Sequence, residues 1–329
     1  MTVFLIRRLF TMVISFLLMS LVIFIIIQLA PGDFITHLMA QMSGGGMRDE
    51  YAREFAENFR RLHGLDQPKW IQYFIWIRNF LTGDMGHSLL HGRPVATLLG
   101  DRLALSFGIS AGSLVFTWLI GIPIGIYSAT HKNTIGDHAA TFVGFLGLSI
   151  PNFFLALVLM IFAVFVIDQP VGMLFSRAYE EAPWSLAKAL DLAKNLWIPI
   201  VVIGTAGTAG TIRVMRGNLL DMLGQPYVTT ARSKGLKERI VVRRHAVRIA
   251  FNPFVSGLGM SLPILLSGET ITAIVLNLPT AGPLLFEALL AEDIYLSASI
   301  LQFYAIFLLL GNLMADIALT WLDPRIRLE

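Results

Sequence analysis

Cysteine is absent from the 329 residues of this chain. Its absence excludes disulfide bonds, catalysis by a thiol and metal sites built on cysteine, and it leaves the redox compartment undetermined. A Gly-Lys dipeptide is absent as well. The phosphate-binding loop of P-loop ATPases needs that pair, because its lysine contacts the nucleotide phosphates. We therefore do not expect this chain to hydrolyse ATP by itself.

Charged residues are scarce. They make up 14% of the chain and hydrophobic residues 55%, whereas a typical soluble domain has about 25% charged residues. The uncharged runs are too long for the core of a soluble domain, and a membrane-spanning helix needs about 20 mostly apolar residues. We therefore predict an all-α integral membrane protein with six transmembrane helices. They are expected at about residues 9–30, 103–129, 139–167, 196–212, 249–279 and 294–322.

The first of these runs follows Arg7 and Arg8, as the apolar part of a signal peptide would. Its length of about 22 residues exceeds the usual apolar stretch of a signal peptide. No clear small-residue cleavage site follows in QLAPGDFITHL. We therefore expect this run to be retained as a span.

The loops differ in charge. With the amino terminus inside, the cytoplasmic segments carry 14 basic and 5 acidic residues, and the outer loops carry 11 basic and 15 acidic residues. Cytoplasmic loops of membrane proteins are enriched in Lys and Arg, so both termini are expected in the cytoplasm. This topology accounts for the net charge of +3. Nucleic acid is therefore not an expected partner.

The predicted spans divide the chain into four segments. Residues 1–30 form an N-terminal transmembrane helix. Residues 31–93 form a small helical region on the outer side, because RDEYAREFAENFRRLHGL and DQPKWIQYFIWIRNFL have helical periodicity. Residues 94–323 form a core of five helices with a cytoplasmic loop at 213–248, and residues 324–329 form a cytoplasmic tail.

Glycine and proline recur inside the predicted spans. Gly108 and Gly112, then Gly121 and Gly125, are spaced four residues apart, and GTAGTAG at 204–210 has a glycine at every third position. Such spacing lets helix backbones approach closely in lipid. Prolines in the same runs remove backbone hydrogen bonds that neighbouring helices or a water-lined cavity must replace. This pattern favours a bundle around a pathway. The prolines are Pro123, Pro151, Pro199 and Pro263.

The most basic segment, YVTTARSKGLKERIVVRRHAVRIAFNP, lies between the fourth and fifth spans. Pro226 suits the first turn of a helix and Gly235 suits a left-handed stop, which predicts a short helix over residues 226–234. A helix this short is not stable alone in water, so it must dock against something. Its candidate docking face consists of the small residues Thr229, Thr230 and Ala231, with Arg232 and Lys234 beside it.

The stretch LKERIVVRRHAVRIAF then predicts a second helix that runs into the fifth span. A simpler reading is that the basic residues anchor the loop at anionic lipid headgroups. That reading explains the charge, but it does not explain the order of helix, stop and helix.

The segment resembles the EAA loop of permease subunits of bacterial ABC importers, in the branch that serves di- and oligopeptide systems. Thr229 stands where other branches have the glutamate that names the loop. The resemblance also covers RRLFTMVISFLLMSLVIFIIIQLAPGD, GLDQPKWIQYFIWIRNFLTGDMGHSLLHGRPV, SIPNFFLALVLM and LDPRIR, and so nearly the whole chain. The matching loop positions are Tyr227, Val228, Thr230, Ala231, Arg232, Lys234, Gly235, Leu236, His245 and Ala246.

This resemblance implies the type I ABC importer permease architecture in a bacterial inner membrane. The implied partners are a second homologous permease, two ATPases that bind ATP and magnesium, and a periplasmic solute-binding protein. The chain itself would have no catalytic residue, cofactor or metal. A coupling helix seated in a groove of the ATPase is implied at Tyr227, Val228, Thr229, Thr230, Ala231, Arg232, Lys234, Gly235 and Leu236.

Peptides are the cargo that the resemblance implies, although the sequence departs from the branch at two places. ETITAIVLNLPTAGPLL keeps Pro279 and Gly282, but it has Ala273 in place of a glutamate and Thr280 in place of a glycine. PGDFI after the first span also departs from the usual PGDP. Oligosaccharides and opine-like compounds are therefore alternative cargoes.

Two acids, Glu269 and Asp316, lie inside predicted spans. Intramembrane acids are candidates for a functional role. Asp316 lies about one turn from the end of its span, which leaves Glu269 as the candidate pathway residue. Glu269 could instead carry a proton in a secondary transporter, or be neutral and hydrogen-bonded to a neighbouring helix. An intramembrane enzyme is not expected, because all seven histidines lie in loops or at span edges.

Overall fold

The computed structural model describes residues 2–29, 57–58, 61, 64, 66–169, 171–179, 182–183 and 185–322. These residues form helices, together with one isolated β-bridge between His87 and Pro94. The helices are α1 (Thr2–Leu29), α4 (Lys69–Leu81), α5 (Val95–Thr130), α6 (Ile135–Ser149), α7 (Asn152–Phe165), α8 (Leu186–Asn195), α9 (Trp197–Leu223), α10 (Pro226–Ser233), α11 (Glu238–Ile240), the π-helix η1 (Val241–Ala246), α12 (Val247–Ala250), α13 (Asn252–Ser256), α14 (Leu258–Val275), α15 (Ala281–Leu290) and α16 (Ile294–Leu322).

Among the described residues, five helices are long and apolar enough to cross a membrane, and the pair α6 and α7 makes a sixth span if the two are counted together. The pair is bent by 96°, so the span predicted over residues 139–167 is present as two helices. The break lies at Ile150 and Pro151. Proline lacks an amide hydrogen and disfavours the helical conformation of the residue before it, which ends α6 there.

Two other predicted spans differ from the observed helices. The fourth runs on to Leu223 as α9, past the predicted end at residue 212, because charged residues at one end of a spanning helix do not stop it. The fifth, predicted over residues 249–279, is divided into α12, α13 and α14. Pro253 lies near the first division and Gly257 at the second. Proline lacks the amide hydrogen that a helix needs, and glycine restrains the backbone least.

The chain separates into two compact units. The first comprises residues 1–105 and 280–309. Within it, α4 packs on α1 through aromatic rings: Phe24 lies 5.5 Å from the ring of Tyr73 and 6.1 Å from that of Trp76. The hydroxyls of Ser20 and Tyr73 lie 2.9 Å apart. The second helical stretch of the predicted outer region therefore packs on the first span. Most of the stretch RDEYAREFAENFRRLHGL and all of the predicted tail lie outside the described residues.

A buried carboxylate organises the other part of the first unit. Asp293 has no exposed surface, and its Oδ2 accepts hydrogen bonds from the hydroxyl of Ser88 at 2.6 Å and the amide of Leu90 at 3.0 Å. Its Oδ1 accepts from the amide of Leu296 at 3.1 Å. Asp293 thus caps the start of α16 and fixes the loop before α5 to it, as a carboxylate at a helix N-terminus can.

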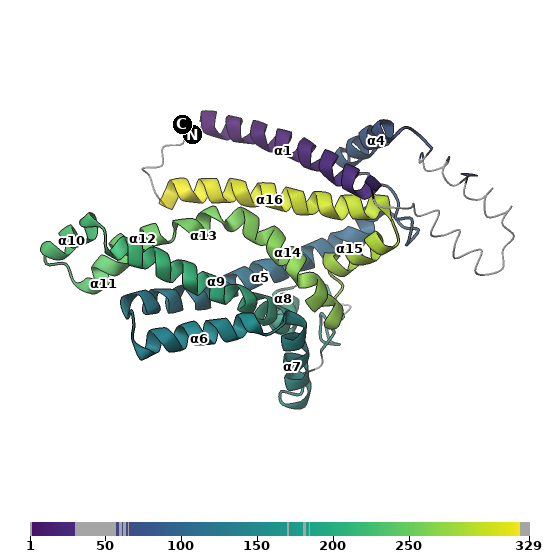
Figure 1. The fold of residues 1–329 in the computed structure, drawn as a ribbon. Coiled ribbons are helices and arrows are strands. Elements are labelled where there is room, and N and C mark those ends of the chain that lie inside the picture. Colours follow the sequence, from purple (N-terminus) through teal and green to yellow (C-terminus); the bar gives the residue numbers. More distant parts are fainter. Residues whose placement is uncertain are drawn as a thin grey trace. The chain divides into compact units, whose positions relative to one another are not determined.

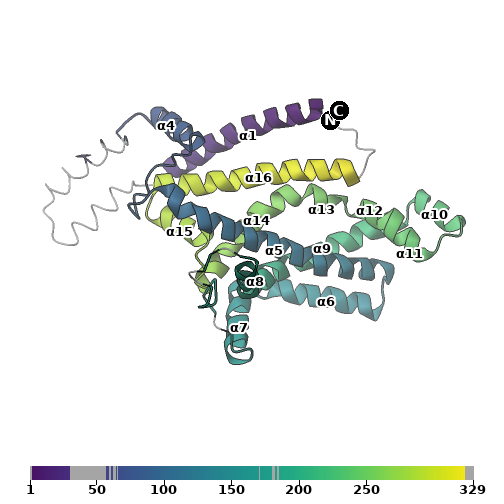
Figure 2. The same cartoon turned by 180° about the vertical axis from the view of Figure 1, so that it is seen from behind.

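The second unit comprises residues 106–279 and 310–329. In it, α5 and α9 approach so closely that glycine is required. A Cβ added at Gly125 would lie 2.7 Å from Cβ of Met215 and 3.0 Å from the carbonyl oxygen of Ile212. A hydrogen bond of 2.9 Å joins the hydroxyl of Thr117 on α5 to the carbonyl of Gly204 on α9. Figures 1 and 2 show α5, α6 and α9 running side by side.

The glycine pattern in the sequence is only partly explained by this packing. Gly112, Gly121 and Gly125 all face side chains of α9, as the four-residue spacing predicts. Gly108 and Gly210 meet open space instead. Spacing alone therefore does not identify the glycines that make helix contacts.

We expect Gly125→Ala to lower the free energy of unfolding by about 1–3 kcal/mol, because the added methyl must displace backbone and Cβ atoms of α9 that cannot rotate away. Gly108→Ala on the same helix is the matched control, since nothing lies within 4 Å of its Cβ position. The measurement is thermal unfolding of the purified chain in detergent. Equal melting temperatures for the two variants would contradict the close packing.

Candidate functional site

The short helix expected near residues 226–234 is present as α10. Pro226 is its first residue and Gln225 its N-cap. Proline suits this position, because the first amide of a helix has no partner within the helix. Figures 1 and 2 show α10 beyond the end of α9, beside α11 and α12. The helix thus forms one end of the second unit.

Two buried side chains of α10 pack against α9 and the π-helix that follows. Val228 has no exposed surface and Ala231 is 6% exposed, and both belong to a cluster that includes Met215 and Leu219 of α9. Val241 from the following π-helix completes this surface. The expectation that Ala231 shares an outward small-residue face with Thr229 and Thr230 is therefore wrong. Ala231 lies three residues after Val228, so the two share the face turned toward α9.

The outward face of α10 is made of small residues. Thr229, Thr230 and Ser233 are exposed and lie opposite Val228 and Ala231. The hydroxyl of Thr230 donates to the carbonyl of Pro226 at 2.9 Å, and that of Ser233 donates to the carbonyl of Thr229 at 3.0 Å. Both hydroxyl hydrogens are used in hydrogen bonds within the helix. The exposed face therefore consists of short side chains that offer methyl groups and oxygen atoms.

Gly235 ends α10 with φ at +75°, the left-handed conformation that the sequence predicts. The amide of Leu236 donates to the carbonyl of Ala231 at 3.4 Å, and the amide of Gly235 donates to that of Arg232 at 2.9 Å. These two bonds form a Schellman motif. No atom lies within 4 Å of a Cβ at Gly235. The backbone conformation alone therefore requires glycine at this position.

An ion pair closes the turn after α10. Arg232 donates through Nε to one carboxylate oxygen of Glu238 at 3.1 Å and through Nη2 to the other at 2.7 Å. This pairing raises the pKa of Arg232 and lowers the pKa of Glu238, with the side-chain hydrogen bonds as the largest cause. Both side chains are well exposed, so the pair orients the turn more than it stabilises the fold.

The second predicted helix of the loop is present, but it contains six residues of π-helix, η1. Val241, Val242 and Ala246 on η1 are buried, whereas Arg243 and Arg244 are exposed. The wider π turn lets the buried side chains face α9 and α10 while the two arginines stay outside. Single π turns inside helices are frequent at functional sites.

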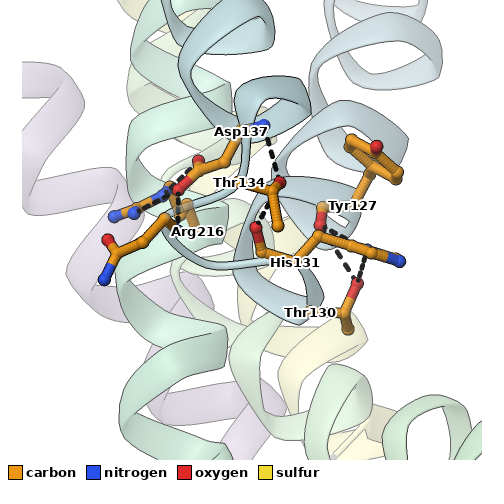
Figure 3. A network of polar contacts seen from close by, with 7 residues as sticks. Tyr127, Thr130, His131, Thr134, Asp137 and Arg216 are labelled. Carbon is orange, nitrogen blue, oxygen red and sulfur yellow. Dashed lines mark hydrogen bonds and ion pairs between the residues drawn. The ribbon is translucent and has the colours of Figure 1, made fainter.

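A second feature of this end of the unit is an ion pair between α6 and α9. Arg216 donates through Nε to Oδ1 of Asp137 at 2.9 Å and through Nη2 to Oδ2 at 2.8 Å. The amide of Asn133 also donates to Oδ2, at 3.0 Å. Asp137 is 1% exposed. Figure 3 shows the two side chains pointing toward each other beside the turn that joins α5 to α6.

The sequence alone does not identify this pair. The sequence feature that points to Asp137 is Thr134 before it. The Thr134 hydroxyl accepts a hydrogen bond from the amide of Asp137 at 3.3 Å and so caps α6. An acidic residue three positions after a threonine is typical of a helix start. Which arginine of the basic loop would meet this acid cannot be read from the spacing.

The remaining candidate, Glu269, lies on α14 and is 1% exposed. This helix, Leu258–Val275, is one of the candidate spans and is separate from α10 in the chain. The structure therefore separates the sequence-predicted residues into two groups, the α10 loop and one buried acid on a spanning helix.

A helical bundle of spanning helices with a short docked helix after α9 defines a membrane permease subunit. The chain belongs to the family described as binding-protein-dependent transport system inner membrane component, whose model matches residues 121–328. The corresponding N-terminal family model matches residues 1–107.

Relatives cover the full length of the chain. The oligopeptide transport system permease protein AppB of Bacillus subtilis is 31% identical, over 99% of both chains. The dipeptide transport system permease protein DppB of Escherichia coli is 27% identical, over 98% of both chains. A chain of the MetNI methionine ABC transporter, solved in inward-facing conformations, superposes with a TM-score of 0.51 at 16% identity, covering 69% of this chain and 96% of that one. This likeness shows a shared fold.

We expect Arg216→Gln to destabilise the chain by about 1–3 kcal/mol, because the carboxylate of Asp137 loses two hydrogen bonds and its charged partner, while the Arg216 side chain is itself 29% exposed. Asp137→Asn combined with Arg216→Gln should recover part of this loss, since no uncompensated charge remains. Thermal unfolding of the two single variants and the double variant measures the coupling. Strictly additive losses would show that the two residues do not act as a pair.

Proposed function

We propose that the chain is the transmembrane subunit of an ATP-driven importer that takes up peptides. In this proposal it pairs with a second homologous permease to form the path, two ATPase subunits bind ATP and magnesium, and a periplasmic protein delivers the cargo. The protein lies in the bacterial inner membrane with both termini in the cytoplasm. The family membership and the distribution of basic residues support this arrangement.

The observation that carries the proposal is the form of α10. Its inner side is fixed to α9 by Val228 and Ala231, and its outer side offers Thr229, Thr230 and Ser233. A groove on an ATPase can accept a narrow face of small side chains, and a rigid anchor then transmits movement of that groove to α9. The proposed contact residues are Tyr227, Thr229, Thr230, Arg232, Lys234 and Leu236, while Val228, Ala231 and Gly235 hold the shape of the helix.

The relatives support peptides as cargo. Both AppB and DppB are named for oligopeptide or dipeptide transport, and both align with this chain from end to end. These names favour peptides over the oligosaccharide and opine-like alternatives that the departures at Ala273 and Thr280 left open.

We expect Thr230→Arg to leave membrane insertion intact and to reduce peptide uptake and cargo-stimulated ATP hydrolysis at least tenfold, because a long charged side chain cannot enter a groove shaped for a threonine. Thr130→Arg is the matched control. Thr130 is also exposed, lies at the end of α5, and donates to the carbonyl four residues earlier at 2.9 Å, as Thr230 does.

The measurement is uptake by proteoliposomes that contain the assembled importer. A single cysteine at position 229 in this cysteine-free chain should also crosslink to an ATPase subunit, whereas one at position 231 should not, because Ala231 is buried. Wild-type uptake and hydrolysis in Thr230→Arg would contradict the docking role of α10.

Glu269 stays a proposed pathway residue. Its burial on α14 places a carboxyl group inside a spanning helix, and glutamine replaces that group with an amide of nearly the same size. We expect Glu269→Gln to reduce peptide uptake severalfold with normal assembly. Uptake and assembly are measured on the same preparation. Unchanged uptake rules out the role, and uptake driven by a proton gradient without ATPase subunits would favour the secondary transporter.

A further inference from the structure

A pocket of about 340 Å³ opens between α6 and α9. One part of its lining is polar and comprises Asp137, His138, Arg213 and Arg216. The other part is apolar and includes Phe145 and Ile212. Gly217 also lines the pocket, and nothing lies within 4 Å of its Cβ position, so the pocket is open on that side.

The two arginines of the pocket differ in their charge balance. Arg216 is held by Asp137 through two hydrogen bonds, and the two charges offset each other. Arg213 lies with its guanidinium carbon 5.0 Å from the ring centroid of Phe145. It forms no ion pair with any carboxylate in the described part of the chain. The pocket therefore has an excess of positive charge, and that charge is already oriented by a cation–π contact.

The surroundings of the pocket are apolar. On α6, the side chains of Phe142 and Phe145 are 63% and 41% exposed. The pair α6 and α7 is long and apolar enough to cross a membrane when counted together, and so is α9. The pocket is lined by the first part of α6 and the second half of α9, and α9 is the helix that leads into α10. The proposed function places this end of α9 on the cytoplasmic side, where the inner leaflet of the membrane meets water, and the inference below rests on that placement.

We propose that this pocket binds the headgroup of an anionic phospholipid from the inner leaflet. The phosphodiester accepts hydrogen bonds from Arg213 and from the N–H groups of Arg216 that Asp137 does not use, since a guanidinium has five such donors. The acyl chains lie along Phe142 and Phe145. A free anion would use only the charged part of this surface, whereas a lipid uses the charged part and the apolar part together.

The test is native mass spectrometry of the full chain, purified in detergent with the subunits that accompany it and titrated with phosphatidylglycerol or with phosphatidylcholine of the same acyl chains. We expect preferential retention of phosphatidylglycerol, and a loss of about fivefold in its affinity in Arg213→Gln. Arg244→Gln is the matched control, because it removes an exposed arginine of the same cytoplasmic loop outside the pocket. Phe145→Leu should weaken retention to a smaller extent.

Three results would overturn the proposal. The first is equal retention in Arg213→Gln and Arg244→Gln, which would show that general charge is responsible. The second is displacement of the lipid by millimolar inorganic phosphate, which would identify a site for a free anion. The third is efficient crosslinking of a cysteine at position 217 to the second permease, which would show that protein covers the pocket. Lipid retention is independent of transport, so failure here is distinguishable from failure of the coupling role of α10.

Discussion

The close packing of α9 against α5 is the contact on which the second unit depends. Lipid offers little driving force for helices to associate through apolar burial, so the contact area between backbones has to be large. Glycines on both helices provide it, as at Gly125 and Gly204. With residues 204 to 215 held in this way, α9 has a fixed direction. The short helix α10, which follows α9 in the chain and packs on it, takes its position from that direction.

The part of α9 beyond Met215 carries charge near the membrane, and that charge has to be compensated. Desolvating an arginine is costly unless a carboxylate and further hydrogen bonds compensate for it. Asp137 supplies the carboxylate, and the amide of Asn133 helps to satisfy it. The same bonds attach the turn between α5 and α6 to α9. A requirement of charge compensation thus produces a rigid connection between three helices at the end where α10 begins.

Sequence predicts the regular parts of this molecule well and the irregular parts poorly. Apolar runs of sufficient length identify the spans, and Pro226 with Gly235 identifies the short helix, because each signal is local. The 96° bend at Pro151 is not predictable in the same way, since a proline in a span can also be accommodated in a continuous helix, as Pro123 is in α5. The inward turn of Ala231 and the Asp137–Arg216 pair depend on α9, and their partners are distant in sequence.

A short helix can transmit force only if its inner side cannot slide. Val228 and Ala231 meet Met215 and Leu219 of α9 and Val241 of η1, so α10 is held by elements both before and after it in the chain. The Schellman turn at Gly235 and the Arg232–Glu238 pair restrict the other end of the helix. A displacement applied to the outer face of α10 must therefore move α9 and η1 together. Because α9 is in turn joined to α5 and α6, the smallest body that can respond comprises α5, α6, α9 and η1 rather than the loop alone.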